Sequence, residues 1–168
     1  DLKGHTLIPG LIEGHAHPVS ASLSEYFEEI PDLHTIKELL QWIKDEAAER
    51  DDDEWIIHPK FFVTRFQEMR QVTRAELDSV APHNPVFLNG SYGGIVNSRA
   101  LDMSRISQSK HEGIIRDKKT GRASGVIRRS AFKLLSINED KSTSHEQHLE
   151  ALKTLLKLYN EVGITSVT

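Results

Sequence analysis

The strongest constraint on the fold is a long amphipathic helix that leads through a glycine into a short β-branched stretch, within residues 144–168. Ser144 and Gln147 have the spacing of a capping box, which predicts that the helix begins just after Ser144. Leucines recur at helical spacing at positions 149, 152, 155 and 156, and Gly163 is a typical helix-ending residue. The stretch "ITSVT" predicts a strand. A helix followed by such a strand is half of a βαβ unit, so the strand requires a parallel neighbour.

The best candidate for this neighbour is the apolar segment at residues 10–17, in "LIPGLIEGHAHP". If it is a strand, His15 and His17 share one face, because side chains two residues apart point the same way. More than a hundred residues separate the two strands, too many for a plain crossover. We therefore predict an α/β chain in three parts. Residues 1–18 carry a lead-in and the first strand, 19–141 form an inserted α+β lobe, and 142–168 carry a helix and the following strand.

Local signals divide the predicted lobe into helices and strands. Capping boxes at Thr35 with Glu38 and at Thr73 with Glu76 predict two helix starts, and Asn97 predicts a third. Strands are expected in "EWIIHPKFFV", where Pro59 interrupts the pattern, and in "NPVFLNG". Two short apolar segments around "DKKTG" are typical of a hairpin at 112–128.

Composition excludes several classes of partner. The net charge is −4 with interspersed signs, so we expect neither nucleic-acid nor membrane binding, and a small-molecule substrate is the favoured partner. The sequence has no cysteine, so a metal would have to be held by His, Asp, Glu or a modified side chain. A cytoplasmic location is compatible with this composition and is the one we expect. The chain starts at Asp1 without a methionine, which is compatible with a processed or trimmed piece of a longer protein.

The pair His15 and His17 has two interpretations. As a metal motif, two histidines one residue apart are weak, since a metal ordinarily needs three or four ligands. The other interpretation is that they are partly buried polar residues at the end of a strand. The context favours a site. The apolar strand ends in two imidazoles on one face, with Glu13 before them and Pro18 after, which is where parallel α/β folds place their chemistry.

The segment "TLIPGLIEGHAHP" resembles the first barrel strand of the amidohydrolase superfamily. "TRAELDSVAPHNPVFLNGSYGGIVNSRAL" and "GIIRDKKTGRASGVI" resemble, in order and spacing, the amidohydrolase type 3 branch, which includes N-substituted formamide deformylase-like enzymes. The resemblance implies the amino-terminal part of a metal-dependent (β/α)8 barrel, with His15 and His17 as the first two metal ligands. The remaining ligands and the catalytic aspartate of the family come mostly from later strands, so the catalytic residues of this chain are unknown.

Departures from the branch lie in segments that face substrate or metal. His58 and Lys60 stand at two branch glycines, and Phe62 stands at the branch acid that follows them. Tyr92 stands at a branch histidine, and Arg129 stands at a branch glutamate. They indicate an altered pocket and nominate Lys60 and Tyr92 as substrate-binding residues. Lys60 in an apolar wall is either desolvated or extended to the surface, and Tyr92 in "GSYGG" is either a hydrogen-bond donor to substrate or part of a plain turn.

We expect part of a metal-dependent hydrolase that cleaves a non-peptide C–N (amide-like) bond with metal-activated water, zinc being the expected cation and the fragment being inactive alone. The alternative is a non-catalytic lobe of the same fold that binds a ligand or a partner. A third hypothesis is a structural fragment that forms homo-oligomers through unpaired strand edges.

Overall fold

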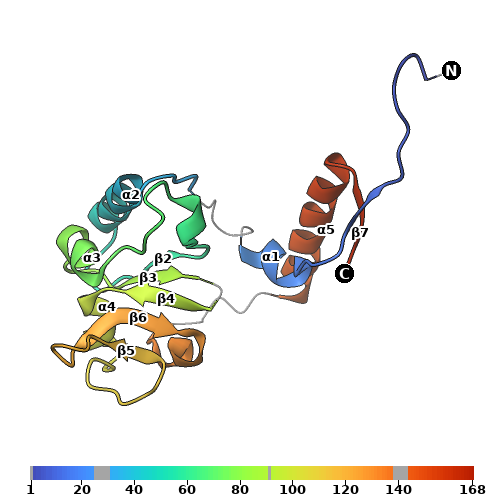
Figure 1. The fold of residues 1–168 in the computed structure, drawn as a ribbon. Coiled ribbons are helices and arrows are strands. Elements are labelled where there is room, and N and C mark those ends of the chain that lie inside the picture. The colour runs from blue at the N-terminus through green and yellow to red at the C-terminus, as the bar shows by residue number, and fades with distance from the viewer. Residues whose placement is uncertain (1, 25–30, 91, 138–143) are drawn as a thin grey trace. The chain divides into compact units, whose positions relative to one another are not determined.

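The computed structural model describes residues 2–24, 31–90, 92–137 and 144–168. The chain divides into two compact units, one made of Asp1–Glu29 with Glu139–Thr168 and the other of Ile30–Asn138 (Figure 1). The predicted division of the chain into residues 1–18, 19–141 and 142–168 stays a prediction. The helix α1 (Pro18–Ser24) belongs to the first unit.

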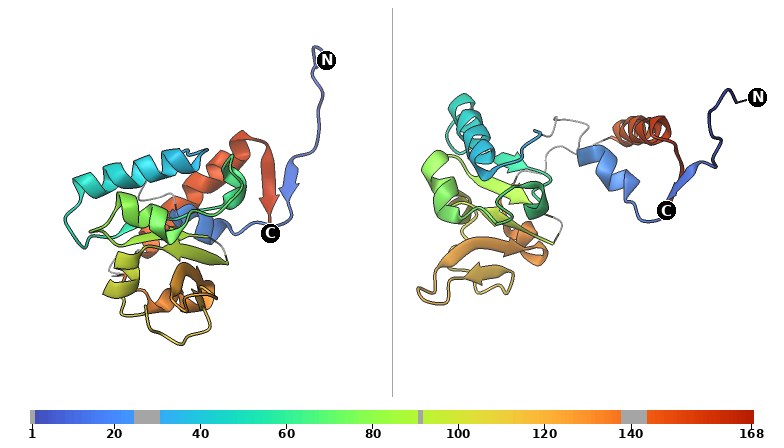
Figure 2. Two further views of the ribbon diagram at one scale, coloured as in Figure 1. Left: turned by 60° about the vertical axis from the view of Figure 1, so that its left-hand side comes forward. Right: turned by 45° about the horizontal axis from the view of Figure 1, so that its top comes forward.

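The first unit contains β1 (Leu11–Glu13), α1, α5 (His145–Glu161) and β7 (Ile164–Val167). β1 and β7 pair in parallel, with Leu11 opposite Ile164 and Glu13 opposite Val167, and they run side by side in Figure 2. This confirms the parallel neighbour that the helix and strand at the end of the sequence require. The capping box of α5 is also confirmed, because Ser144 Oγ accepts from the Gln147 backbone N–H at 3.1 Å.

β1 is shorter than the strand predicted at residues 10–17. The chain leaves the extended conformation after Glu13, so His15 and His17 lie in the turn between β1 and α1. The apolar side chains of this strand are exposed, Leu11 at 52% and Ile12 at 71%. Parallel sheets normally have both faces covered, so these exposed apolar side chains are unusual for a parallel strand. The described residues form an α/β fragment without a closed barrel.

The second unit is built around a five-stranded sheet in the order β2-β3-β4-β6-β5. β2 and β3 are parallel and the other pairs are antiparallel. The strands are β2 (Ile56–His58), β3 (Val86–Asn89), β4 (Gly93–Val96), β5 (Ile114–Arg116) and β6 (Ala123–Arg128). The helices are α2 (Ile36–Glu49), α3 (Arg74–Val80) and α4 (Ser98–Met103), with 3-10 turns η1 (Val63–Arg65) and η2 (Arg129–Leu134). The antiparallel pair β5–β6 confirms the predicted hairpin.

Alternation along β3 shows that both faces of this sheet are covered. Val86 and Leu88 pack into a core with α2 and α3, whereas Phe87 packs into a second core with α4 and η2. Successive strand residues point to opposite faces, so each face has its own apolar layer. α2 contributes Ile36, Leu39 and Ile43 to the first layer, which is the spacing of one helical face.

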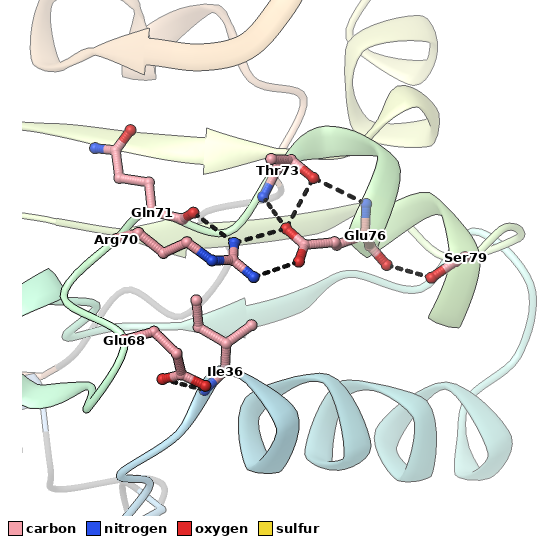
Figure 3. Close-up of polar contacts among 7 residues, drawn as sticks. All are labelled: Ile36, Glu68, Arg70, Gln71, Thr73, Glu76 and Ser79. Carbon is pink, nitrogen blue, oxygen red and sulfur yellow. Dashed lines mark hydrogen bonds and ion pairs between the residues drawn. The ribbon is translucent and has the colours of Figure 1, made fainter.

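The predicted helix starts of this unit are confirmed. Thr35 and Glu38 form a reciprocal capping box, as do Thr73 and Glu76 (Figure 3). Asn97 caps α4 by accepting from the Ala100 N–H at 2.9 Å. None of the helices in the described ranges combines the length and the apolar character that a membrane span requires.

Candidate functional site

His15 and His17 lie close together just beyond the carboxyl end of β1. Their ring centroids are 5.3 Å apart and the ring planes meet at 72°. Both side chains are exposed. The carboxyl end of a parallel strand is where α/β folds usually place their reactive groups.

The turn that carries these histidines is hydrogen-bonded to Thr168, the last residue of the described chain. The Ala16 N–H donates to the carbonyl of Thr168 at 3.1 Å, and the Thr168 hydroxyl donates to the carbonyl of Gly14 at 2.9 Å. The His15 N–H donates to Glu13 Oε1 at 2.9 Å. The backbone on both sides of His15 is therefore tied down, while the imidazoles themselves project outward.

The centroid separation of 5.3 Å at 72° is that of an ordinary edge-to-face contact between two rings, and it also leaves the two imidazoles close enough to bind one cation. No group of three or more His, Cys, Asp or Glu suited to a metal ion is found in the described ranges, so the pair supplies an incomplete ligand set.

The predicted substrate-binding residue Lys60 lines a cavity of about 280 Å³ in the second unit. It is half-buried and follows the end of β2 by two residues. We call this space the His58 cavity; it is lined by Pro31, Asp32, Leu33, His34, His58, Lys60, Arg65 and Phe66. The sequence signal nominated Lys60 but missed His34 and Arg65, which come to the cavity from segments before α2 and within η1.

His58 is the most buried polar group of this cavity, with 3% of its surface exposed. Its ring meets the indole of Trp42 edge to face, with centroids 5.5 Å apart. Burial, reinforced by the charge of Arg65, lowers the pKa of His58 to about 4, so the imidazole is neutral at pH 7. Nδ1 is buried and has no hydrogen-bond partner in the part of the chain that is described, which costs about 1–3 kcal/mol.

Tyr92, the other predicted substrate-binding residue, lies apart from that lining. Its side chain is 89% exposed, just before β4, and its carbonyl accepts from the Arg129 N–H at 3.1 Å. Among the residues that depart from the branch, the structure thus brings His58 and Lys60 together in one lining, and a backbone hydrogen bond joins Arg129 to Tyr92.

A larger hollow of about 440 Å³ lies along α2 and α3, and three charged residues of its lining, Glu68, Arg70 and Glu76, have structural partners. Arg70 forms a two-pronged ion pair with Glu76, at 2.7 and 3.1 Å, while both carboxylate oxygens of Glu68 accept from the Ile36 N–H at 3.1 Å (Figure 3). Together with Thr73, Arg70 lowers the pKa of Glu76 to about 2. This network joins the starts of two helices and is a structural feature.

Comparison with known proteins gives a family match over the whole chain. The model described as "Amidohydrolase family" matches residues 1–168. N-substituted formamide deformylase of Arthrobacter pascens is 32% identical over 177 residues, covering 99% of this chain and 33% of that protein. Exoenzymes regulatory protein AepA of Pectobacterium carotovorum is 27% identical, over 100% of this chain and 38% of that protein. The chain thus spans about a third of the length of these curated relatives. A solved "uncharacterized metal-dependent hydrolase" of Pyrococcus furiosus is 20% identical over 95% of this chain and 31% of its own, with a TM-score of 0.47.

Proposed function

Because this chain belongs to the amidohydrolase family, we propose that it is part of a metal-dependent hydrolase that cleaves a non-peptide C–N bond with metal-activated water. The observation that carries the proposal is the pair of exposed, neighbouring imidazoles just beyond the carboxyl end of β1, with ring centroids 5.3 Å apart. The barrel that the family implies would be completed by chain outside these residues.

His15 and His17 act as neutral imidazole ligands in this proposal. A divalent cation held there, for which we propose zinc, would supply an activated water molecule and polarise the bond to be cleaved. The chain's own contribution is to position the imidazoles: the contacts of Ala16 and Gly14 with Thr168 hold the turn against the end of β7. Such fixed placement of ligands is what lets a metal site form without large rearrangement.

Lys60 and Tyr92 remain our proposals for substrate binding. Lys60 is supported by its place in the His58 cavity, and Tyr92 by an exposed side chain on a glycine-flanked segment. The cavity volume of about 280 Å³ lies just below the range of about 300–1,000 Å³ that is usual for small-molecule sites. We keep a cytoplasmic location as a proposal.

Elemental analysis tests the metal assignment. We expect metal in the longest natural form of the protein, and a sharp loss of both metal and hydrolysis in His15→Ala/His17→Ala. The matched control is His145→Ala/His148→Ala, which removes two histidines from the first turn of α5 and is expected to leave metal content unchanged. Equal metal in both double variants and the parent would contradict the assignment.

The alternative function, a non-catalytic binding lobe, is tested on the same protein. Turnover of amide-like substrates that is abolished by a chelator counts against it. Homo-oligomer formation is a further proposal, supported by the exposed Leu11 and Ile12 on the two-stranded sheet. A monomeric elution volume in size-exclusion chromatography would contradict it.

A further inference from the structure

The peptide group between Gly14 and His15 is held at both of its ends by side chains. The Thr168 hydroxyl donates to its carbonyl oxygen, which belongs to Gly14, at 2.9 Å. The Glu13 carboxylate accepts from its N–H, which belongs to His15, at 2.9 Å. We call these two contacts the Gly14–His15 clamp. Because a peptide group is planar and rigid, fixing both its oxygen and its nitrogen fixes the point from which the His15 side chain departs.

The clamp lies where the pairing of β1 with β7 becomes irregular. Glu13 is opposite Val167, and the Thr168 N–H donates to the Glu13 carbonyl at 3.2 Å, as in a regular parallel ladder. The next bond of such a ladder would run from the His15 N–H to the Thr168 carbonyl. It comes from the Ala16 N–H instead, at 3.1 Å, one residue later. The His15 N–H is thereby left to the Glu13 carboxylate, and an extra residue of this kind re-aims a side chain beside a functional site.

His17 is held by a different element. Its carbonyl accepts from the Ala21 N–H at 2.9 Å, at the start of α1, and from the Ser20 hydroxyl at 3.2 Å. The backbone at His17 is therefore set by a helix, whereas the backbone at His15 depends on the clamp. The separation of the two imidazoles, 5.3 Å between centroids, depends on both anchors.

We propose that Glu13 and Thr168 are positioning residues for the metal pair, which keep the His15 imidazole close enough to His17 for both rings to bind one cation. Each side chain acts through the Gly14–His15 peptide group and not on the cation itself. The inference rests on the proposed function, because it assigns a role only if His15 and His17 are ligands. Loss of a hydrogen bond that orients a metal ligand typically weakens metal binding by about 10–100-fold.

The zinc affinity of the longest natural form of the protein, measured by competition with a chromophoric chelator, tests the clamp. Thr168→Val keeps the branched shape and strand preference of the side chain but removes the hydroxyl, and we expect it to weaken zinc binding by about tenfold or more. Glu13→Ala should have an effect of the same size. Thr168→Ser and Glu13→Gln keep a hydroxyl and a side-chain carbonyl oxygen for the two contacts, so each should have the zinc affinity of the parent.

Thr165→Val is the matched control, because it removes another hydroxyl from β7. That hydroxyl lies 3.5 Å from the Leu11 carbonyl, at the other end of β1 from the histidines, so zinc affinity should stay that of the parent. Far-ultraviolet circular dichroism of each variant separates loss of zinc binding from loss of fold. Retention of zinc in the serine and glutamine variants separates positioning from general destabilisation.

Either of two results would overturn the proposal. Zinc affinity unchanged in Thr168→Val or in Glu13→Ala would show that the clamp does not position the pair. Losses in Thr168→Ser and Glu13→Gln as large as those in Thr168→Val and Glu13→Ala would show that the two hydrogen bonds are not the cause.

Measuring His15→Ala/His17→Ala alongside keeps this failure distinct from failure of the proposed function. If the double variant loses zinc while Thr168→Val retains it, the metal assignment stands and the positioning role fails. Zinc affinity unchanged in the double variant would overturn both.

Discussion

Replacing Asn97 tests the energetics of the second unit most directly, because its buried side-chain amide makes four hydrogen bonds to backbone. Nδ2 donates to the carbonyls of Ala81 and Asn84 at 2.9 and 2.8 Å. Oδ1 accepts from the N–H groups of Val86 and Ala100 at 3.0 and 2.9 Å. The side chain is 0% exposed, so water cannot take its place without rearrangement. One amide thus joins the end of α3, the start of β3 and the start of α4.

The expected loss for Asn97→Ala follows from these contacts. Each buried backbone group left without a partner costs about 1 kcal/mol or more, so four groups with partial relaxation give about 3–4 kcal/mol. That is a large part of the total stability of a domain, about 5–15 kcal/mol. Gln67→Ala is the matched control, since it removes an exposed amide of the same unit and should change the free energy of unfolding by less than about 0.5 kcal/mol.

Asn97→Asp separates loss of hydrogen bonds from loss of volume. The new oxygen would face the carbonyls of Ala81 and Asn84, so burial and repulsion should raise the pKa of the introduced carboxyl in the folded state. A raised folded pKa gives a contribution that is present below the unfolded pKa, about 3.9, and is lost as pH rises through the folded pKa. The variant should therefore be closest to wild type in acid and fall behind it as pH rises.

Urea unfolding followed by tryptophan fluorescence is the assay, because Trp42 and Trp55 both lie in the second unit and report on it alone. The reasoning fails if Asn97→Ala loses no more than Gln67→Ala. It also fails if the deficit of Asn97→Asp relative to wild type is independent of pH.

Three further predictions concern His58, Glu76 and Thr35, each followed by the same urea assay. The folded pKa of His58, about 4, lies below its ordinary 6.5, so the unfolded chain binds a proton first as pH falls and stability drops between pH 6.5 and 4. The drop should reach up to about 3 kcal/mol and disappear in His58→Phe; an unchanged pH profile in that variant would contradict it. The pKa of Glu76 is lowered to about 2, chiefly by the hydrogen bonds from Arg70, so its stabilisation is present above pH 4.5 and is lost as pH falls toward 2. Glu76→Gln should be less stable than wild type at pH 7, with the gap narrowing by pH 3; a constant gap would argue against the ion pair. Thr35→Ala should lose about 1 kcal/mol by removing the capping box of α2, and Thr35→Ser should lose less because it keeps the hydroxyl; equal losses would contradict a capping role.

Features formed by residues close together in the chain were predictable from the sequence alone. The capping boxes at Thr35, Thr73 and Ser144 occur as expected, because each is a contact between residues three apart. The β5–β6 hairpin and the need of β7 for a parallel partner also follow from local pattern and the geometry of a βα connection. The motif "GHAHP" indicated where to look for a metal pair, although its role as a ligand set stays a prediction.

Tertiary structure decided what depends on residues far apart in the chain. The strand before His15 stops at Glu13, and the turn beyond it is bonded to Thr168, at the other end of the described chain. The His58 cavity likewise needs residues 31–34, the end of β2 and η1 to meet, and no local pattern records that meeting. Helix caps and turns are set by short-range hydrogen bonds that the sequence displays. A cavity and the pKa of a histidine within it depend on which distant side chains exclude water, and only the folded chain determines that.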